Sequence, residues 1–332
     1  MAEIISVLMP VKNAGKFLAE TIESIIGQSF RDWELIAIDD SSEDDSVEIL
    51  QHFNQLDSRI NYFQNDDQGI IAALQKGYFE SRGQHITRID ADDIMPSDRL
   101  SQMVTLLKDA PPKTIVTGQV KYFGRKPISE GYLKYENWLN ERCKEKDHWN
   151  WVYRECVVAS PNWLVRKSEL EALGGFQSLC YPEDYDLTFK LYQNGFHIHS
   201  VNDTTLLWRE HPDRTSRNSS HYNQESFFRL KLDHFIKYEL KDEELLLWGV
   251  GVKGKLTAQI LLDQSIKFIW MAKDSAQYNS PIFGMDIKNP DLDARKKPYK
   301  ILIAVYPENQ VDDIIAYLSG FNLKMGTDYW FL

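Results

Sequence analysis

The sequence predicts an α/β protein: a parallel, doubly wound sheet covered by helices, followed by a second, smaller α/β domain of Rossmann type. Short apolar runs alternate with segments of helical periodicity from the N-terminus onward, which is typical of strands joined by crossover helices. The alternation restarts after a charged stretch at 239–244. A chain of 332 residues is long enough for two buried cores. We therefore expect one domain at 1–240 and another at 243–332.

The first domain should open with three strand–helix repeats and a fourth strand. The first strand should stop at Pro10, because proline lacks the N–H that a ladder needs. Leu18, Ile22 and Ile25 recur at helical spacing, so the first helix should bury this face. Strands are expected at 4–9, 33–38, 60–63 and 85–89, and helices at 17–26, 47–53, 70–79, 183–195 and 227–238.

The second domain should begin with a strand, a glycine-rich turn and a helix. The glycines Gly249, Gly251 and Gly254, with Asp274 twenty positions after the last of them, match the dinucleotide-binding fingerprint. A second nucleotide site is one interpretation. Close packing of the helix on its strand is the other, since glycine serves that purpose as well. Strands are expected at 245–248, 266–271, 301–305 and near 329, and helices at 255–262 and 311–318.

The bulk composition excludes some classes of protein. The net charge of −11 disfavours a nucleic-acid partner unless a local basic face exists, because phosphate neutralisation supplies most non-specific affinity. The N-terminus lacks the basic and apolar regions of a signal peptide, and no apolar stretch is long enough to span a bilayer. Cys143, Cys156 and Cys180 show no CxxC spacing, which indicates three packed thiols in a reducing cytoplasm.

Carboxylates gather where the strand at 85–89 ends. Asp90, Ala91 and Asp92 form an Asp-x-Asp triplet, and crowded anions are stabilised by a hard divalent cation with oxygen ligands. Mg²⁺ or Mn²⁺ at such a site keeps open positions for the phosphates of a substrate. Alternatively, Asp93 or Ser97 could cap a helix that begins near Pro96.

Two further polar clusters should lie beside this triplet. Pro10–Asn13 follows the first predicted strand and Asp39–Asp40 follows the second. The carboxyl ends of parallel strands meet at one edge of a sheet, and ligands of doubly wound sheets bind there. Eight aromatic residues between 121 and 160 either pack in the core or form an acceptor-binding surface.

Together these motifs resemble the family 2 glycosyltransferases. The resemblance covers roughly residues 4–216 and implies the nucleotide-sugar-binding fold called GT-A. It also implies an enzyme that moves a hexose from a UDP-sugar to an acceptor hydroxyl. The matching segments are 7–13, 39–42, 67–77, 90–92, 183–184 and 208–211.

The resemblance implies roles for the matching residues. Asp184 would be the base that takes the acceptor proton in an inverting transfer, supported by Glu183. Without the resemblance, the same two acids are simply favoured at a helix N-terminus. Asp92 would bind Mn²⁺ or Mg²⁺, with His211 as a further metal ligand. The nucleotide-sugar would be bound by Pro10, Val11, Asn13, Asp40, Asp67, Asp90, Ala91 and Arg209.

A closer similarity in layout is to the β-1,3-N-acetylglucosaminyltransferase-like proteins, which are associated with galactosylation of queuosine in tRNA. It depends on Trp248–Lys255, on Tyr181–Asp184 and Leu207–Pro212 before it, and on Tyr135–Asn140. Bacterial polysaccharide enzymes carry similar C-terminal segments. The acceptors expected are therefore a surface glycan or its lipid-linked precursor first, compatible with peripheral membrane association, and tRNA second. A non-catalytic nucleotide-binding module is the alternative from another class, and intact Asp92 and Asp184 argue against it.

Overall fold

The computed structural model describes residues 3–177, 179–273, 275–278, 280–290, 292, 298–305 and 310–332. The chain forms two compact units. The first is Met1–His148 with Val157–Asn218, and the second is Trp149–Cys156 with Ser219–Leu332. Helix α9 (Gln224–Tyr238) belongs to the second unit, so the units divide the chain at other positions than the boundary predicted at 240–243.

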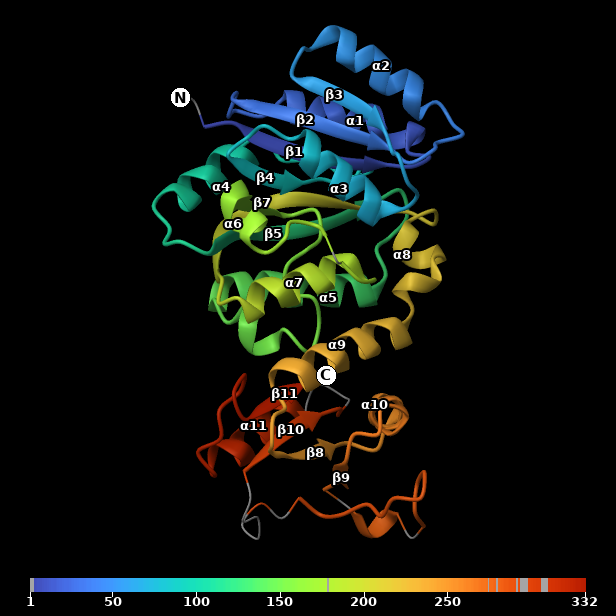
Figure 1. Ribbon diagram of the computed structural model, residues 1–332, viewed down its shortest axis with the longest axis vertical. Helices are drawn as coiled ribbons and strands as arrows, with labels where there is room; N and C mark the ends of the chain where they lie inside the picture. The colour runs from blue at the N-terminus through green and yellow to red at the C-terminus, as the bar shows by residue number, and fades with distance from the viewer. Residues whose placement is uncertain are drawn as a thin grey trace. The chain divides into compact units, whose positions relative to one another are not determined.

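The first unit is built on a seven-stranded sheet in the order β3-β2-β1-β4-β6-β5-β7. Figure 1 shows the first four of these in succession, from β3 at the top through β2 and β1 to β4. The four strands from the first half of the chain are parallel to one another, as predicted, and β5 is parallel to β7. Strand β6 runs antiparallel to both of its neighbours, so the sheet is mixed rather than wholly parallel. The strands are β1 (Ile5–Val11), β2 (Trp33–Asp39), β3 (Ile60–Gln64), β4 (His85–Arg88), β5 (Thr114–Gly124), β6 (Trp163–Arg166) and β7 (His197–Glu210).

Helices connect these strands. Leu18, Ile22 and Ile25 on α1 are fully buried, which confirms the apolar face predicted from their spacing. The helices of the first unit are α1 (Gly15–Ile26), α2 (Ser46–Leu56), α3 (Ile70–Glu80), α4 (Arg99–Lys108), α5 (Glu130–Glu145), α6 (Lys167–Ala172), α7 (Glu183–Gln193) and α8 (Thr215–Asn218).

The expectation that β1 stops at Pro10 is wrong. The strand continues to Val11, and Pro10 is in register with Ile38 of β2. The carbonyl of Leu8 accepts a hydrogen bond from Ile89 on the β4 side, so Pro10, two residues later, faces the same side. Because β4 ends at Arg88, no ladder partner is lost there, and proline is tolerated in the strand.

The aromatic segment is more regular than its sequence suggests, since β5 and α5 cover much of it. Tyr122 is buried and stacks on Trp208 of β7, with ring centroids 4.9 Å apart, and Tyr153 is also buried. For these residues the core interpretation is correct. The burial of large aromatic side chains is among the strongest contributions to a core.

The second unit contains a four-stranded parallel sheet in the order β11-β10-β8-β9. Its strands are β8 (Glu244–Trp248), β9 (Phe268–Met271), β10 (Tyr299–Ile303) and β11 (Tyr329–Phe331), and its other helices are α10 (Val252–Asp263) and α11 (Val311–Ser319). Trp151 stacks on Phe331 at 5.6 Å, which explains why residues 149–156 belong to this unit. Short 3₁₀ helices lie at His148–Trp151, Ser220–Tyr222 and Ser275–Gln277.

Two expectations from composition can be compared with the structure. Within the described residues, no helix has the length and apolar character needed to cross a membrane. Cys143 and Cys156 are buried, as predicted, but Cys180 is exposed. The prediction of three packed thiols is therefore wrong for Cys180, because this residue lies in the loop before α7 rather than in the core.

Candidate active site

The three polar clusters lie at one edge of the first sheet. β2, β1 and β4 are adjacent and parallel, so their carboxyl ends meet. The backbone N–H of Asp40 donates to the carbonyl of Val11 at 2.8 Å, and that of Ile89 donates to Leu8 at 3.0 Å. The segments after all three strands are thus held side by side by backbone hydrogen bonds.

Asp40 is buried at this edge and already has several donors. Its Oδ1 accepts hydrogen bonds from the Asn65 side chain at 2.8 Å and from the Gly69 N–H at 2.9 Å, while its Oδ2 pairs with Lys12 at 3.1 Å. Gly69 has φ of +94°, a conformation that favours glycine. The carboxylate therefore fixes the turn before α3, and Asp67 lies exposed in that turn.

The loop after β1 is equally well fixed. Asn13 has φ of +50°, its N–H donates to the Ser42 hydroxyl at 2.9 Å, and its side chain accepts from Glu43 N–H at 2.8 Å. Pro10 and Val11 form the last part of β1 before this loop. The loops after β1 and β2 are consequently joined to one another by hydrogen bonds.

The acidic triplet is connected to α7 through an arginine. Arg88, the last residue of β4, donates from Nε to Asp90 Oδ1 at 2.9 Å and from a terminal nitrogen to Glu183 Oε1 at 3.1 Å. Both Arg88 and Glu183 are buried. Ala91, in the middle of the triplet, accepts a hydrogen bond from the Thr21 hydroxyl at 3.0 Å through its carbonyl. Arg88 is not among the residues predicted from the sequence, and its position two residues before an acidic motif was the available signal.

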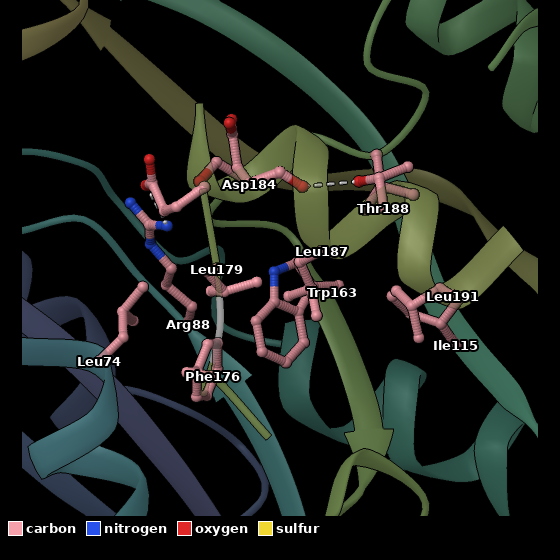
Figure 2. Close-up of a pocket in the computed structure, with 13 residues that line it drawn as sticks. Leu74, Arg88, Ile115, Trp163, Phe176, Leu179, Asp184, Leu187, Thr188 and Leu191 are labelled. Carbon is pink, nitrogen blue, oxygen red and sulfur yellow. Dashed lines mark hydrogen bonds and ion pairs between the residues drawn. The ribbon is translucent and has the colours of Figure 1, made fainter. Parts of the chain in front are cut away.

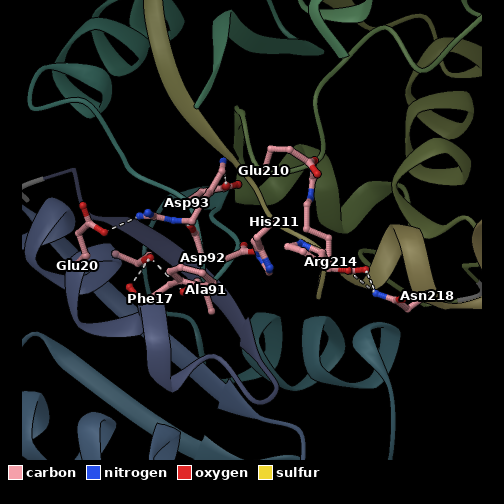
Figure 3. Close-up of polar contacts among 12 residues, drawn as sticks. Phe17, Glu20, Ala91, Asp92, Asp93, Glu210, His211, Arg214 and Asn218 are labelled. Atoms are coloured by element: carbon pink, nitrogen blue, oxygen red, sulfur yellow. Dashed lines mark hydrogen bonds and ion pairs between the residues drawn. The ribbon is translucent and has the colours of Figure 1, made fainter. Parts of the chain in front are cut away.

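Asp92 lies against His211, the residue after β7. Its Oδ2 is 2.7 Å from the Nε2 of His211, and the imidazole also contacts the Phe17 ring at 4.7 Å (Figure 3). His211 Nδ1 is buried and has no hydrogen-bond partner. Two residues predicted as metal ligands, 119 positions apart in the sequence, are thus brought together.

The capping alternative for this segment is not what the structure shows. Helix α4 begins at Arg99 with Asp98 at the N-cap position, and no side chain caps it. Asp93 is instead buried, and one of its oxygens accepts from the Arg209 N–H at 2.8 Å. Its other oxygen is buried without a partner. Neither Asp93 nor Ser97 is therefore present as a helix cap.

Two arginines supply positive charge beside Asp92. Arg209 donates from Nε to the Asp92 carbonyl at 2.5 Å and pairs with Glu20 at 2.6 Å. Arg214 lies on the other side of His211 (Figure 3), pairs with Glu210 at 3.2 Å, and stands over the Trp208 ring at 5.2 Å. From the sequence alone Arg214 shows no link to the site, since nothing local indicates that Tyr122 of β5 and Trp208 of β7 lie against it.

Glu183 and Asp184 are the first two residues of α7, which confirms the helix N-terminus interpretation, while their role in catalysis stays a prediction. Burial first, and then the neighbouring Glu183 charge, raise the pKa of the Asp184 carboxyl to about 7, while the Arg88 charge acts in the opposite direction. Figure 2 shows Arg88 and Asp184 at the polar end of a pocket whose other labelled residues are mostly apolar, among them Phe176 and Trp163. A half-buried carboxyl with such a pKa is suited to proton transfer near neutral pH.

Asp92 and His211 fit a divalent cation of the kind that binds nucleotide phosphates. Among the residues that the structure describes, no group of three or more His, Cys, Asp or Glu side chains forms a complete protein cage for a metal. Mg²⁺ and Mn²⁺ at nucleotide sites do not require one, because one or two protein ligands are completed by phosphate oxygens and water. The carboxylate oxygen of Asp92 and the imidazole nitrogen of His211, which are in contact, match that donor set.

The glycine turn of the second unit has partly structural explanations. A Cβ on Gly249, which has φ of +125°, would lie 2.4 Å from the Ala304 carbonyl oxygen. A Cβ on Gly254 would lie 2.1 Å from the Gly249 carbonyl oxygen. A Cβ on Gly251 would meet nothing within 4 Å. Asp274, the acidic residue of the predicted fingerprint, lies outside the described residues, and a second nucleotide site here stays a prediction.

The sequence is similar to known proteins of one kind, the glycosyltransferases. The family model described as glycosyl transferase family 2 matches residues 6–174, more than half of the chain. Glycosyltransferase GlyG of Streptococcus pneumoniae is 25% identical over 215 residues, which cover 63% of this chain and 71% of that protein. The probable glycosyltransferase YdaM of Bacillus subtilis is 24% identical over 216 residues, which cover 63% of this chain and only 51% of that protein.

Solved structures show the same fold. TarS 1–349 of S. aureus, in complex with UDP-GlcNAc, superposes with a TM-score of 0.56 at 14% identity over 78% of this chain and 72% of that one. The mannosyltransferase PcManGT from Pyrobaculum calidifontis, in complex with GDP-Man and Mn²⁺, has a TM-score of 0.51 at 18% identity over 72% of this chain and 63% of that one. These similarities confirm the predicted GT-A fold.

Proposed function

The chain belongs to the family 2 glycosyltransferases, and we propose that it is an inverting, metal-dependent enzyme that moves a hexose from a UDP-sugar to an acceptor hydroxyl. The proposed acceptor is a surface glycan or glycolipid precursor, reached from the cytoplasmic side. The observation that carries the proposal is the joining of two acidic motifs: Arg88 bridges Asp90, at the metal and diphosphate side, to Glu183, beside the proposed base.

The donor assignment is supported by the neighbours of known structure. TarS has been solved in complex with UDP-GlcNAc and with UDP, and PcManGT in complex with GDP-Man and Mn²⁺. The loops after β1 and β2, with Pro10, Val11, Asn13, Asp40 and Asp67, are the proposed nucleoside side of this site. The side chain of Lys12 is 57% exposed, so it can move away from Asp40. The carboxylate of Asp40 would then be free to accept a hydrogen bond from the nucleobase of the donor.

In the proposed mechanism, Asp184 takes the proton of the acceptor hydroxyl as that oxygen attacks the anomeric carbon. The new bond forms on the face opposite the leaving group, so the configuration at the anomeric carbon is inverted. The bond to the diphosphate oxygen breaks, and UDP leaves with the electron pair. Glu183 supports the base by holding its helix to Arg88, and no covalent nucleophile is required.

Charge on the leaving diphosphate must be offset for this reaction to proceed. Asp92 and His211 would hold Mn²⁺ or Mg²⁺, and such an ion, when bound, supplies charge stabilisation to the diphosphate oxygens. Arg209 and Arg214 add positive potential on the same side of the site. Asp90 and Ala91 shape the turn that presents Asp92.

The direct test is UDP release from a panel of UDP-sugars with Mn²⁺ and with EDTA. We expect turnover of at least one donor, loss of turnover in EDTA, and a transferred sugar with inverted anomeric configuration by NMR. No turnover of any donor, together with tight UDP binding, would favour the non-catalytic binding module. Retention of configuration would contradict the role of Asp184.

The acceptor needs a separate experiment. We expect that deletion of the gene leaves the nucleosides of tRNA unchanged by mass spectrometry and alters a surface glycan. Loss of a hexosyl-queuosine from tRNA would instead assign the second acceptor, queuosine in tRNA.

A further inference from the structure

Arg88 connects two parts of the site that lie far apart in the sequence. It ends β4, and the two carboxylates it binds belong to the acidic triplet and to the first turn of α7. Only 5% of its side chain is exposed, and 2% of that of Glu183. Arg88 and Glu183 are 95 positions apart, so their contact is made by the fold rather than by a local turn.

We propose that Arg88 is a positioning residue that sets the proposed base on α7 relative to the diphosphate side of the site. The proposal rests on the proposed function. The guanidinium is planar and has several N–H groups in a fixed arrangement, so it can bind Asp90 with one edge and Glu183 with another. A lysine ammonium is a single point charge and cannot reproduce both sets of directed hydrogen bonds.

The backbone that carries Arg88 is itself fixed. Arg99 is fully buried and donates to the Arg88 carbonyl at 3.0 Å and to the Thr87 hydroxyl at 3.1 Å. The Thr87 hydroxyl in turn donates to the carbonyl of Trp163 on β6. The end of β4 is therefore held from behind, and the Arg88 side chain transmits that fixed position to α7.

Position matters because the proposed base is the residue next to Glu183. Asp184 extends from the same helical turn, and its Oδ1 accepts a hydrogen bond from the backbone N–H of Tyr185 at 2.8 Å. A displacement of about 1 Å in a reacting group costs on the order of 100-fold in rate. Without Arg88, Glu183 becomes a buried carboxylate lacking this ion pair, and such a group is expected to move toward water. Asp184 would move with it.

The proposed metal ligand Asp92 is contacted by Arg209 and His211, so loss of Arg88 should affect turnover more than binding of UDP with Mn²⁺. We expect Arg88→Gln to lower kcat about 100-fold while the Kd for UDP with Mn²⁺, measured by calorimetry, changes less than about fivefold. Arg88→Lys should recover part of kcat, because it restores one charge but not both sets of directed bonds. Turnover is measured as UDP release from the UDP-sugar that the unmodified protein uses fastest.

Arg166 provides a matched control in the same sheet. It ends β6, pairs in register with His85 at the opposite end of β4 from Arg88, and donates to the carbonyls of Leu107 and Ala110 at 2.6 and 2.8 Å. It also binds a carboxylate, that of Glu169, at 3.2 Å. Arg166→Gln should lower Tm as Arg88→Gln does, and leave kcat unchanged. An equal fall in kcat for both variants would overturn the proposal, because it would mean that the effect comes from stability alone.

Glu183→Gln keeps the test decisive if Arg88→Gln does not fold. It keeps the shape of the side chain and removes the charge that Arg88 binds. We expect Glu183→Gln to lower kcat as much as Arg88→Gln does. The double variant should lose no more than either single variant, because both substitutions remove the same interaction between Arg88 and Glu183. Independent, multiplying effects would overturn the proposal, as would full activity of Arg88→Gln. If the unmodified protein releases no UDP from any donor, the proposed function is wrong. If the unmodified protein releases UDP and Arg88→Gln has the same kcat, only the positioning role of Arg88 is wrong.

Discussion

The edge of the first sheet and the glycine turn of the second unit are both strand–turn–helix motifs, but their residues are used differently. At the first, side chains from α7, from the end of β4 and from the segments after β4 and β7 contact one another: Arg88 binds Glu183, and Asp92 contacts His211. At the second, Gly249 and Gly254 are accounted for by backbone atoms that leave no room for a Cβ. One motif assembles polar groups from distant segments, and the other mainly lets a helix approach its strand.

The difference teaches that spacing alone is a weak guide to a binding site. The glycine spacing at 249–254 matches the dinucleotide pattern as well as the acidic triplet matches the Asp-x-Asp pattern. What separates them is whether ionisable side chains converge. Burying a carboxylate costs free energy, so such a group is retained mainly where it binds a cation or takes part in a reaction. Glycines at a tight turn need no such explanation, because they are favourable for packing by themselves.

The largest effect should come from Asp184→Asn. An amide cannot accept the acceptor proton as a carboxylate does, so we expect transfer to fall about 1,000-fold, within the range for general bases. UDP binding with Mn²⁺ should stay within about twofold, measured by calorimetry. Transfer that persists near the original rate would show that another residue is the base. The edge of the first sheet would then no longer differ from the glycine turn in having a catalytic carboxylate.

Gly254→Ala and Gly251→Ala test the other side of the comparison. The new Cβ at 254 would meet the Gly249 carbonyl oxygen, so we expect a loss of about 3 kcal/mol in the free energy of unfolding. At 251 there is open space and φ of −70°, so the loss should be below about 1 kcal/mol. Denaturant unfolding of both variants measures this. Equal losses would contradict the packing explanation, and loss of NAD binding in Gly251→Ala alone would support a nucleotide site in the turn.

The pH dependence sharpens the role of Asp184. Its pKa is raised to about 7 by burial and by Glu183, and the base must be ionised. Below pH 7, kcat/KM should therefore rise about tenfold per pH unit and then level off. The contribution of this carboxyl to stability has the opposite trend: it is fully present below about pH 4 and is lost as the pH rises through about 7. Asp184→Asn should thus gain in Tm relative to the unmodified protein above pH 7; a flat rate profile between pH 5 and 8 would argue against this base.

The smallest effect should come from His211→Ala. We expect about tenfold weaker apparent affinity for Mn²⁺, because one of two proposed protein ligands is lost while Asp92 and the diphosphate remain. The Mn²⁺ dependence of UDP release measures it. His221→Ala provides the control, because it removes a histidine that is not a proposed ligand, and it should leave the Mn²⁺ dependence unchanged.

The sequence was sufficient for much of the fold. Periodicity located α1, α3 and β2 to within a few residues, because each has a strong apolar pattern and is bounded by polar or glycine residues. It missed β5 and α5, where large aromatic side chains occur on both elements without a clear period. It also missed the antiparallel direction of β6, since strand direction depends on connections that span many residues.

The sequence by itself determined which acidic residues follow the strands predicted at 33–38 and 85–89, because the ends of strands can be read from local apolar runs. Only the tertiary structure decided that Arg88 joins Asp90 to Glu183 and that Arg214 stands over Trp208. The physical reason is that such contacts depend on strand order and register. Burial of the whole core sets strand order and register, and no short segment of the chain contains that information.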